Sequence, residues 1–571
     1  MTTDSTFATH RVDDIPLLIA VIKHMGLERI LAELVPTHGN TRYHCLLSTG
    51  AALCIWLVYL ISQGDHRKWK MEEWVALHTA VLSKLWGEPV VPGDFSDDRL
   101  STLAAYVGRA EILAAIDQAV GEQILSLVEL DHLRLDATVF TGYHAPTAGG
   151  LMQYGQRKGG PAGCTQYKLM AAATGAGQYV AGQFSPGHRA DDPLYVPLLD
   201  QLFTQCQSPG MLFVGDCKMG SLATRRHIAT HGHYYYLPVS QPALSSETRE
   251  QLVEAAVAGQ LSGLAPIVRE EQLLGYGYEM SREVSCAGTV WTERMHIIRA
   301  LSQVEAERKT LERRMATACA GLRALPPPPK QGVKAYTDAA VLAQKIAALL
   351  DPEDLHGLVE YTLTVEPYTT KKGPKKSPKK GAKKGTETEM AVRYVVRDVH
   401  VNAEVVRERL HRAGWRVFVT TAPPERLSLE AGQVLYRQGA GQGIERMNEI
   451  LKAHDTLGFH SLYVRTDEQL RGLGALMTLA LRIIMHIEIT IRINLAQEKR
   501  PLSDYYPQGR TSTKPTTKTM LERITFRGVT LLETWDRAGH RHWQLSPLPV
   551  ILVEMLQHLH LEPTVYTQLI E

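Results

Sequence analysis

Three acidic residues occupy positions where a carboxylate needs a partner. Asp136 lies inside the apolar run LRLDATVF, and Asp216 directly follows the apolar run MLFVG. Glu445 follows Ile444 on a segment with helical periodicity. An acid within an apolar strand is costly to bury unless a counter-charge, such as a metal ion, meets it. Two strand-borne acids and one helical acid at one end of a sheet would bind Mg²⁺ or Mn²⁺ through oxygen.

Such a site has a defined chemistry and also simpler alternatives. Two divalent ions can activate a water or hydroxyl and stabilise the leaving oxygen of an in-line phosphoryl displacement. Alternatively, Asp136 is a turn acid at a strand end, Asp216 is the N-cap of the next helix, and Glu445 is a solvated helix acid near Lys452. Glu449 is a lesser candidate for the third acid.

The elements that must position these acids change character near residue 130. Hydrophobic periodicity and glycine punctuation predict the order β-β-β-α-β-α-β, with strands at 133–140, 166–173, 179–184, 211–215 and 233–239 and helices at 193–206 and 222–230. Three antiparallel strands followed by a crossover to parallel strands resemble a ribonuclease-H-like sheet. We therefore expect an α/β protein with a ribonuclease-H-like mixed sheet as its core.

The rest of the chain suggests a core interrupted by an insertion. We expect a helical N-terminal domain over 1–125. This domain would bind DNA ends or form a dimer, or it would have no chemistry of its own. The core would occupy 126–240 and 415–500, with an insertion domain at 241–414 and a C-terminal region at 501–571. Helical patterns predict that one continuous helical stretch from Leu429 carries Glu445, and that a long apolar helix ends near Leu495.

Net charge alone does not identify a partner. The chain of 571 residues carries +2 at pH 7, but residues 371–384 contain eight lysines and no acid, so the remainder sums to +2 − 8 = −6. Such a Lys/Pro/Gly tract does not pack. It is either a solvating linker or a DNA contact without sequence preference, with steep salt dependence. The candidate contacts are Lys375, Lys376, Lys379 and Lys380.

Cysteine usage and hydropathy favour a cytoplasmic protein. The seven cysteines form no CxxC pair, so neither a zinc ribbon nor a thioredoxin-like site is indicated. The polar, acid-bearing first residues do not resemble a signal peptide. Two apolar stretches, 46–61 and 472–495, are either too short or too interrupted by charge for a membrane span. We expect both to be buried core helices and expect no membrane partner.

Several motifs together resemble a known family. The chain is similar to cut-and-paste DDE transposases of bacterial insertion sequences, of the insertion-sequence-4 type, in the branch with a helical N-terminal domain. The resemblance spans about 130–240 and 415–495 and is weaker over 10–110. It rests on LDATVF (135–140), YGQRKGG (154–160), QYKLMAAATGAGQYVAGQFSPGHRADD (166–192), VGDCKMGSLATRRHI (214–228), IERMNEILK (444–452) and LYVRTDEQLRG (462–472).

The resemblance implies roles for individual residues. Asp136, Asp216 and Glu445 match the family's metal-binding acids, which hold two Mg²⁺ or Mn²⁺ ions. Lys452, seven positions after Glu445, would contact a DNA phosphate, and Arg446 could do likewise. The implied partners are double-stranded DNA, as the element's terminal inverted repeats and as target, and a second subunit in a homodimer on DNA. The implied location is the bacterial cytoplasm, on the nucleoid.

One departure from the family pattern leaves alternatives open. The family places Tyr seven and Arg four positions before the Glu, where this chain has Gln438 and Gly441. Tyr436 and Arg437 lie nine and eight positions before it, so a two-residue bulge would restore their DNA contacts. Glycines 439, 441 and 443 weaken a helix by about 1 kcal/mol each. The alternative functions are an impaired or repurposed DNA-binding protein and a simple ribonuclease-H-like nuclease.

Overall fold

The structure is a computed structural model with two compact units. It describes residues 7–37, 47–128, 130–156, 163–206, 208–239, 246–258, 264–269, 271–325, 336–372, 387–438, 443–453, 456–458, 462, 464–536 and 539–571. Unit 1 comprises Met1–Ala243, Glu283–Glu293 and Val419–Glu571, and unit 2 comprises Leu244–Arg282 and Arg294–Phe418. Each unit is described by itself.

A mixed sheet forms the centre of unit 1. Five neighbouring strands of this sheet run in the order β4-β3-β2-β5-β6. Antiparallel pairs join β2 to β3 and β3 to β4, whereas β2–β5 and β5–β6 are parallel. The strands are β2 (His132–Gly142), β3 (Thr165–Thr174), β4 (Tyr179–Pro186), β5 (Leu212–Val214) and β6 (Tyr234–Pro238), with α7 (Tyr195–Cys206) and α8 (Leu222–Thr230) between them. The predicted order of elements in this region is confirmed.

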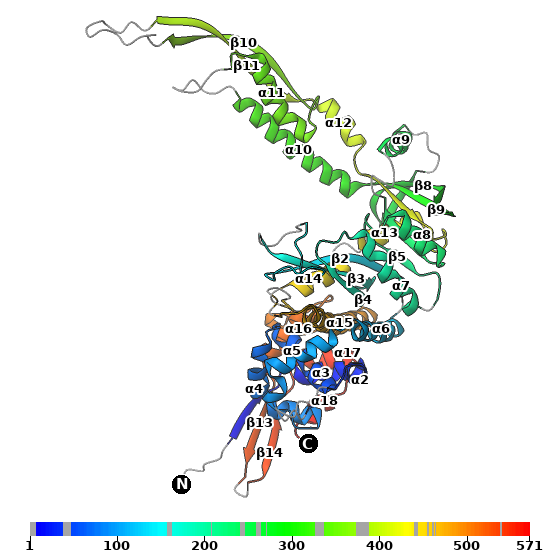
Figure 1. Cartoon of the computed structure of the whole chain (residues 1–571), viewed down its shortest axis with the longest axis vertical. Coiled ribbons are helices and arrows are strands. Elements are labelled where there is room, and N and C mark those ends of the chain that lie inside the picture. Colours follow the sequence, from blue (N-terminus) through cyan, green and yellow to red (C-terminus); the bar gives the residue numbers. More distant parts are fainter. Residues whose placement is uncertain are drawn as a thin grey trace, which may run out of the picture. The chain divides into compact units, whose positions relative to one another are not determined.

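Helices from both ends of the chain complete unit 1 (Figure 1). The N-terminal helices are α1 (Ile15–His24), α2 (Leu27–Leu34), α3 (Thr49–Gln63), α4 (Lys68–Trp86), α5 (Asp97–Val107) and α6 (Ala110–Leu127). The C-terminal helices are α13 (Leu429–Gln438), α14 (Ile444–Lys452), α15 (Asp467–Glu498), α16 (Thr517–Arg527), α17 (Val550–His558) and α18 (Thr564–Thr567). A separate sheet joins β1 (Phe7–Arg11), β13 (Thr530–Trp535) and β14 (Arg541–Leu545). The N-terminal strand was not predicted.

Helix α15 is the apolar axis of unit 1. It is long and apolar enough to cross a membrane, but 83% of its most apolar window is buried inside the protein. Thr466 and Gln469 form the capping box that starts it. The buried Arg482 donates to the Asp117 carboxylate and, at 2.5 Å, to the Val180 carbonyl, and it lies 4.5 Å from the Tyr179 ring centroid. Its charge is thereby compensated, as burial requires.

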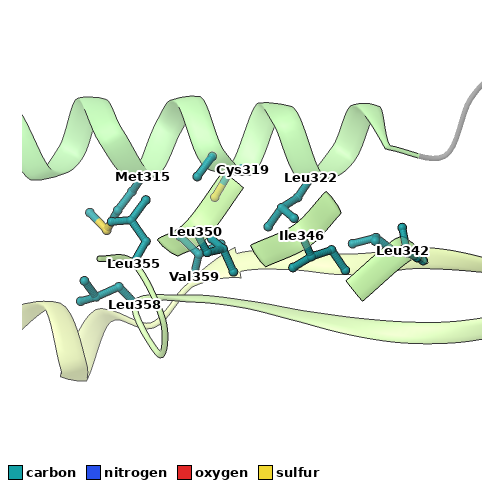
Figure 2. Packing of buried hydrophobic residues seen from close by; sticks show 11 residues of the cluster. Met315, Cys319, Leu322, Leu342, Ile346, Leu350, Leu355, Leu358 and Val359 are labelled. Carbon is teal, nitrogen blue, oxygen red and sulfur yellow. The ribbon is translucent and has the colours of Figure 1, made fainter. Parts of the chain in front are cut away.

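Unit 2 contains a helical pair beneath a long antiparallel ribbon (Figure 1). Leucine, isoleucine and methionine side chains of α10 (Leu301–Ala324) and α11 (Ala339–Leu350) pack together with Val359 and Val396 of the ribbon strands β10 (Val359–Lys372) and β11 (Glu387–Val401) (Figure 2). The remaining elements lie wholly or partly in unit 2 and are α9 (Ser246–Val257), β7 (Ala265–Arg269), β8 (Gln272–Cys286), β9 (Thr289–Ala300), α12 (Ala403–His411) and β12 (Trp415–Thr420). Strands β7 to β10 were not predicted.

Two glycines allow α5 and α15 to touch backbone to backbone. A Cβ atom on Gly472 would lie 1.8 Å from the Ala104 carbonyl oxygen, and one on Gly108 would lie 1.7 Å from that of Glu468. Such distances are far below van der Waals contact, so any side chain here would force the helices apart.

We therefore expect Gly472→Ala to lower the free energy of unfolding by about 1–3 kcal/mol, because overpacked interiors cost that much. Denaturant unfolding followed by circular dichroism measures the change. Gly93→Ala is the matched control, because nothing lies within 4 Å of the added Cβ atom. Equal stability of the two variants would contradict the close approach of α5 and α15.

Candidate active site

The three predicted acids line one cavity of unit 1. Asp136, Asp216 and Glu445 surround a space of about 290 Å³. Asp136 and Asp216 are half-buried, and Glu445 is exposed. The other lining residues are Arg134, Leu135, Val214, Gly215, Tyr436 and Ile444. The structure thus brings together residues that are more than 300 positions apart in the sequence.

Strand register places the two aspartates at the same level. In the parallel pair β2–β5, Arg134 lies opposite Val214. Asp136 and Asp216 each follow two residues later, so both acids lie just beyond the end of that pairing. Because β2 continues to Gly142, Asp136 lies within the strand, and the alternative of a strand-end turn acid is wrong.

Glu445 comes from a separate helix in the described chain. Helix α13 ends at Gln438 and α14 begins at Ile444, so the prediction of one helical stretch through Glu445 is wrong at this point. Residues 439–442 lie outside the described residues. Glu445 occupies the first turn of α14, and Asn448, nearly one turn later, donates its Nδ2 to Asp136 Oδ2 at 3.4 Å. This contact joins the helix to the strand that carries the first acid.

Hydrogen bonds fix the orientation of Asp216. Its Oδ1 accepts from the Tyr195 hydroxyl at 2.9 Å and from the backbone N–H of Lys218 at 2.9 Å. No described residue donates to Oδ2 of Asp216. Helix α8 is capped by Ser221, whose hydroxyl accepts from Thr224 N–H, so the alternative of Asp216 as its N-cap is wrong.

Tyr195 was not predicted from the sequence. Burial raises its pKa well above the usual range, and the charge of Asp216 and its hydrogen bond act in the same direction. The phenol therefore stays protonated and can only orient the carboxylate. A tyrosine at the start of an apolar helix gives no signal of this role, because the role depends on the crossover that returns to β5.

A fourth acid lies nearby but is already neutralised. The buried Asp191 accepts from Lys168 Nζ at 2.5 Å through Oδ1 and from Lys218 through Oδ2. Both carboxylate oxygens therefore meet an ammonium group, which competes with any metal ion for them. Asp191 is close enough to help raise the Tyr195 pKa. We therefore do not count it among the metal-binding acids.

Arg134 is the cation among the described lining residues of the cavity, and it too was not predicted. It precedes Asp136 by two strand positions, which puts both side chains on one face of β2. It is 7% exposed, and its guanidinium donates to the Leu435 carbonyl. Burial lowers the Arg134 pKa, whereas Tyr436 and Glu445 oppose that shift. A charged residue inside the run LRLDATVF was the available signal.

Some of the residues that were predicted to contact DNA interact with other parts of the protein in the structure. Arg446 forms a bidentate pair with the buried Glu488, at 3.0 and 2.9 Å. Lys452 Nζ lies 5.8 Å from the Phe140 ring centroid. Tyr436 lines the cavity and packs edge-on against Tyr236. Arg437 is half-buried on α13. Lys375, Lys376, Lys379 and Lys380 lie outside the described residues.

The donor set suits a hard divalent cation, but it is not preassembled. Three carboxylates around one cavity are the oxygen ligands that Mg²⁺ and Mn²⁺ prefer. Among the described residues, however, no three Asp, Glu, His or Cys groups are arranged so that they could hold a metal ion as they stand. At least one of the acids would therefore have to turn toward the others when an ion binds.

Comparison with known proteins identifies the family. Residues 129–483 match the family described as "Transposase DDE domain", which covers more than half of the chain. The chain belongs to this transposase family. The DDE domain so delimited contains all three acids, Arg134 and Tyr195. No curated protein sequence matches the chain. A solved structure, the piggyBac transposase synaptic complex with hairpin DNA, is similar over 99% of this chain and 86% of that chain, with 9% identity and a TM-score of 0.34.

The position of Glu445 in the DDE domain depends on Glu488. The Glu488 carboxylate is 1% exposed and also meets Arg492 Nη2 at 3.0 Å and Thr517 N–H at 3.1 Å. We expect Glu488→Gln to lower the free energy of unfolding by about 3–5 kcal/mol, because it leaves two arginines without their buried acid. Amide hydrogen exchange in α14 should become faster.

Glu498→Gln is the matched control, since it removes a carboxylate from the exposed end of the same helix. Its effect should stay within about 0.5 kcal/mol, as is usual for surface substitutions. Unchanged exchange in α14 of Glu488→Gln would show that Glu488 does not position this helix.

Proposed function

We propose that the protein is a cut-and-paste DNA transposase of bacterial insertion-sequence type. It binds the terminal inverted repeats of its element, pairs two ends in a homodimer, and cleaves and joins DNA in the bacterial cytoplasm, on the nucleoid. The observation that carries the proposal is the convergence of Asp136, Asp216 and Glu445 on one cavity inside the matched DDE domain. A ribonuclease-H-like core would be the scaffold.

The proposed reaction is a pair of phosphoryl transfers. In the first, a water oxygen attacks the phosphorus at the element end, the bond from phosphorus to the 3′ oxygen breaks, and a 3′-hydroxyl is released. In the second, that 3′ oxygen attacks a phosphorus of target DNA, the bond from this phosphorus to the target's own 3′ oxygen breaks, and a target 3′-hydroxyl leaves. Asp136, Asp216 and Glu445 would hold two Mg²⁺ or Mn²⁺ ions, and such ions would supply activation of the attacking oxygen and stabilisation of the leaving oxygen.

Other residues of the chain would orient and bind. Tyr195 holds one oxygen of Asp216, which leaves the other for the metal ion. Asn448 steadies Asp136 from α14. Lys452, Tyr436 and Arg437 are proposed to contact the DNA backbone near the cavity, and the lysines of 371–384 to add a salt-sensitive, sequence-independent grip. Arg446 would contribute to DNA binding only by giving up part of its pairing with Glu488.

The competing proposal is a DNA-binding protein that has lost cleavage. The glycines before Glu445 motivate it, since they leave Gln438 and Gly441 where the family has Tyr and Arg. Three carboxylates around one cavity argue against it, because a protein that only binds phosphates gains nothing from clustered negative charge. A simple nuclease would share the cavity but would not join the cleaved end to target DNA.

The test is cleavage and joining of labelled duplex DNA that carries the element ends, with Mg²⁺ or Mn²⁺. We expect end cleavage and strand transfer, and we expect Asp216→Asn to reduce both by at least about a hundredfold, the scale of losing a charged transition-state contact. Asp200→Asn on α7 is the matched control, since Asp200 is exposed and pairs with His227. Its activity should equal that of the wild type.

Each other outcome points to a different function. Tight binding of the ends without cleavage in either metal would favour the DNA-binding protein. Cleavage without joining would favour the nuclease. Cleavage that persists in Asp216→Asn would remove Asp216 from the metal-binding set.

A further inference from the structure

Arg134 carries a positive charge in a cavity proposed to receive metal ions. Three carboxylates and one guanidinium line this space. The Coulomb energy between charges grows as water is excluded, so a buried guanidinium disfavours the arrival of a divalent cation nearby. Two bound divalent ions would bring four positive charges to a cavity that already holds the positive charge of Arg134. The three acids supply only three negative charges.

Arg134 is also held in place. Its Nη2 donates to the Leu435 carbonyl on α13, one residue before the cavity-lining Tyr436. The side chain is 7% exposed, so it does not leave readily for solvent. Metal loading must therefore take place in the presence of this charge.

One donor of Arg134 is unsatisfied. Its Nε is buried and has no hydrogen-bond partner among the described residues. Buried donors usually find an acceptor. Because Arg134 lines the cavity, its unpaired donor points to a ligand that brings an acceptor. A DNA phosphodiester brings both an acceptor oxygen and one negative charge.

We propose that Arg134 couples metal loading of the acid cavity to the entry of a DNA phosphate. Without DNA, the guanidinium compensates the acids and keeps metal affinity low. When a phosphodiester enters, one of its non-bridging oxygens accepts from Arg134, its negative charge offsets the added cations, and the acids turn toward the metal. This inference rests on the proposed function, and it names a regulation of that same site.

The test measures Mn²⁺ affinity rather than activity. Calorimetric titrations use the full chain alone and with a short duplex carrying one element end, with the titration of DNA alone subtracted. We expect DNA to tighten Mn²⁺ binding by the wild type about tenfold or more, within the range typical of coupled sites. In Arg134→Gln, Mn²⁺ binding without DNA should be about tenfold tighter than in the wild type, and DNA should change it less than about threefold.

Two further variants separate charge from structure. Arg134→Lys keeps the charge and should retain the weak, DNA-dependent Mn²⁺ binding of the wild type. Arg29→Gln removes a charge from the exposed face of α2 and should bind Mn²⁺ as the wild type does. Circular dichroism verifies that each variant is folded.

Failure of this inference is distinguishable from failure of the proposed function. If wild-type protein binds Mn²⁺ through Asp216 with equal affinity with and without DNA, the coupling is wrong, whether or not Arg134→Gln folds. If Arg134→Gln is folded and binds Mn²⁺ with wild-type affinity, Arg134 is not its source. If the wild type shows no Mn²⁺ binding that depends on Asp216, with or without DNA, the proposed metal site itself is wrong.

Discussion

A single buried carboxylate determines where the third acid of the site lies. Glu488 of α15 meets Arg446 of α14 and the first N–H of α16, so three helices share one ionic centre. Arg446 is the immediate neighbour of Glu445. Because breaking a buried pair leaves uncompensated charges, these helices cannot shift independently at low cost. The geometry of the cavity therefore depends on an interaction on the opposite side of α14 from the strands.

The sheet provides the second constraint on the cavity. Strand β2 has an antiparallel neighbour on one side and a parallel neighbour on the other, and the parallel register brings Asp216 level with Asp136. Tyr195 and Asn448 then fix these acids from helices. A surplus of negative charge is tolerable here because Arg134 lies among the acids and two lysines neutralise Asp191. The site combines rigid backbone positions with a charge balance that a ligand can change.

Sequence patterns predicted those elements and residues whose structure depends on neighbouring residues in the chain. Alternation and glycine turns predicted the strands and helices of 130–240, and helical periodicity predicted the long apolar helix α15. The acids were predictable because an apolar strand makes a charge conspicuous. Tyr195, Asp191 and Glu488 were missed because their roles exist only through contacts with distant elements. Strand β10 was missed because its partner lies beyond a lysine tract. The break between α13 and α14 was missed because the glycines before Glu445 were taken to weaken one helix rather than to separate two.

The pairing of β1 with β13 has a consequence for biosynthesis. His10 and Glu533, which contact each other across these strands, are 523 residues apart in the sequence. At about 5–20 residues per second, the ribosome needs roughly 25–100 s to deliver the partner strand. During that time β1 is an unpaired edge, the kind of segment that associates with other chains. Unit 1 thus reaches its final form only after β13 has been synthesised, whereas the helical pair and ribbon of unit 2 can form earlier.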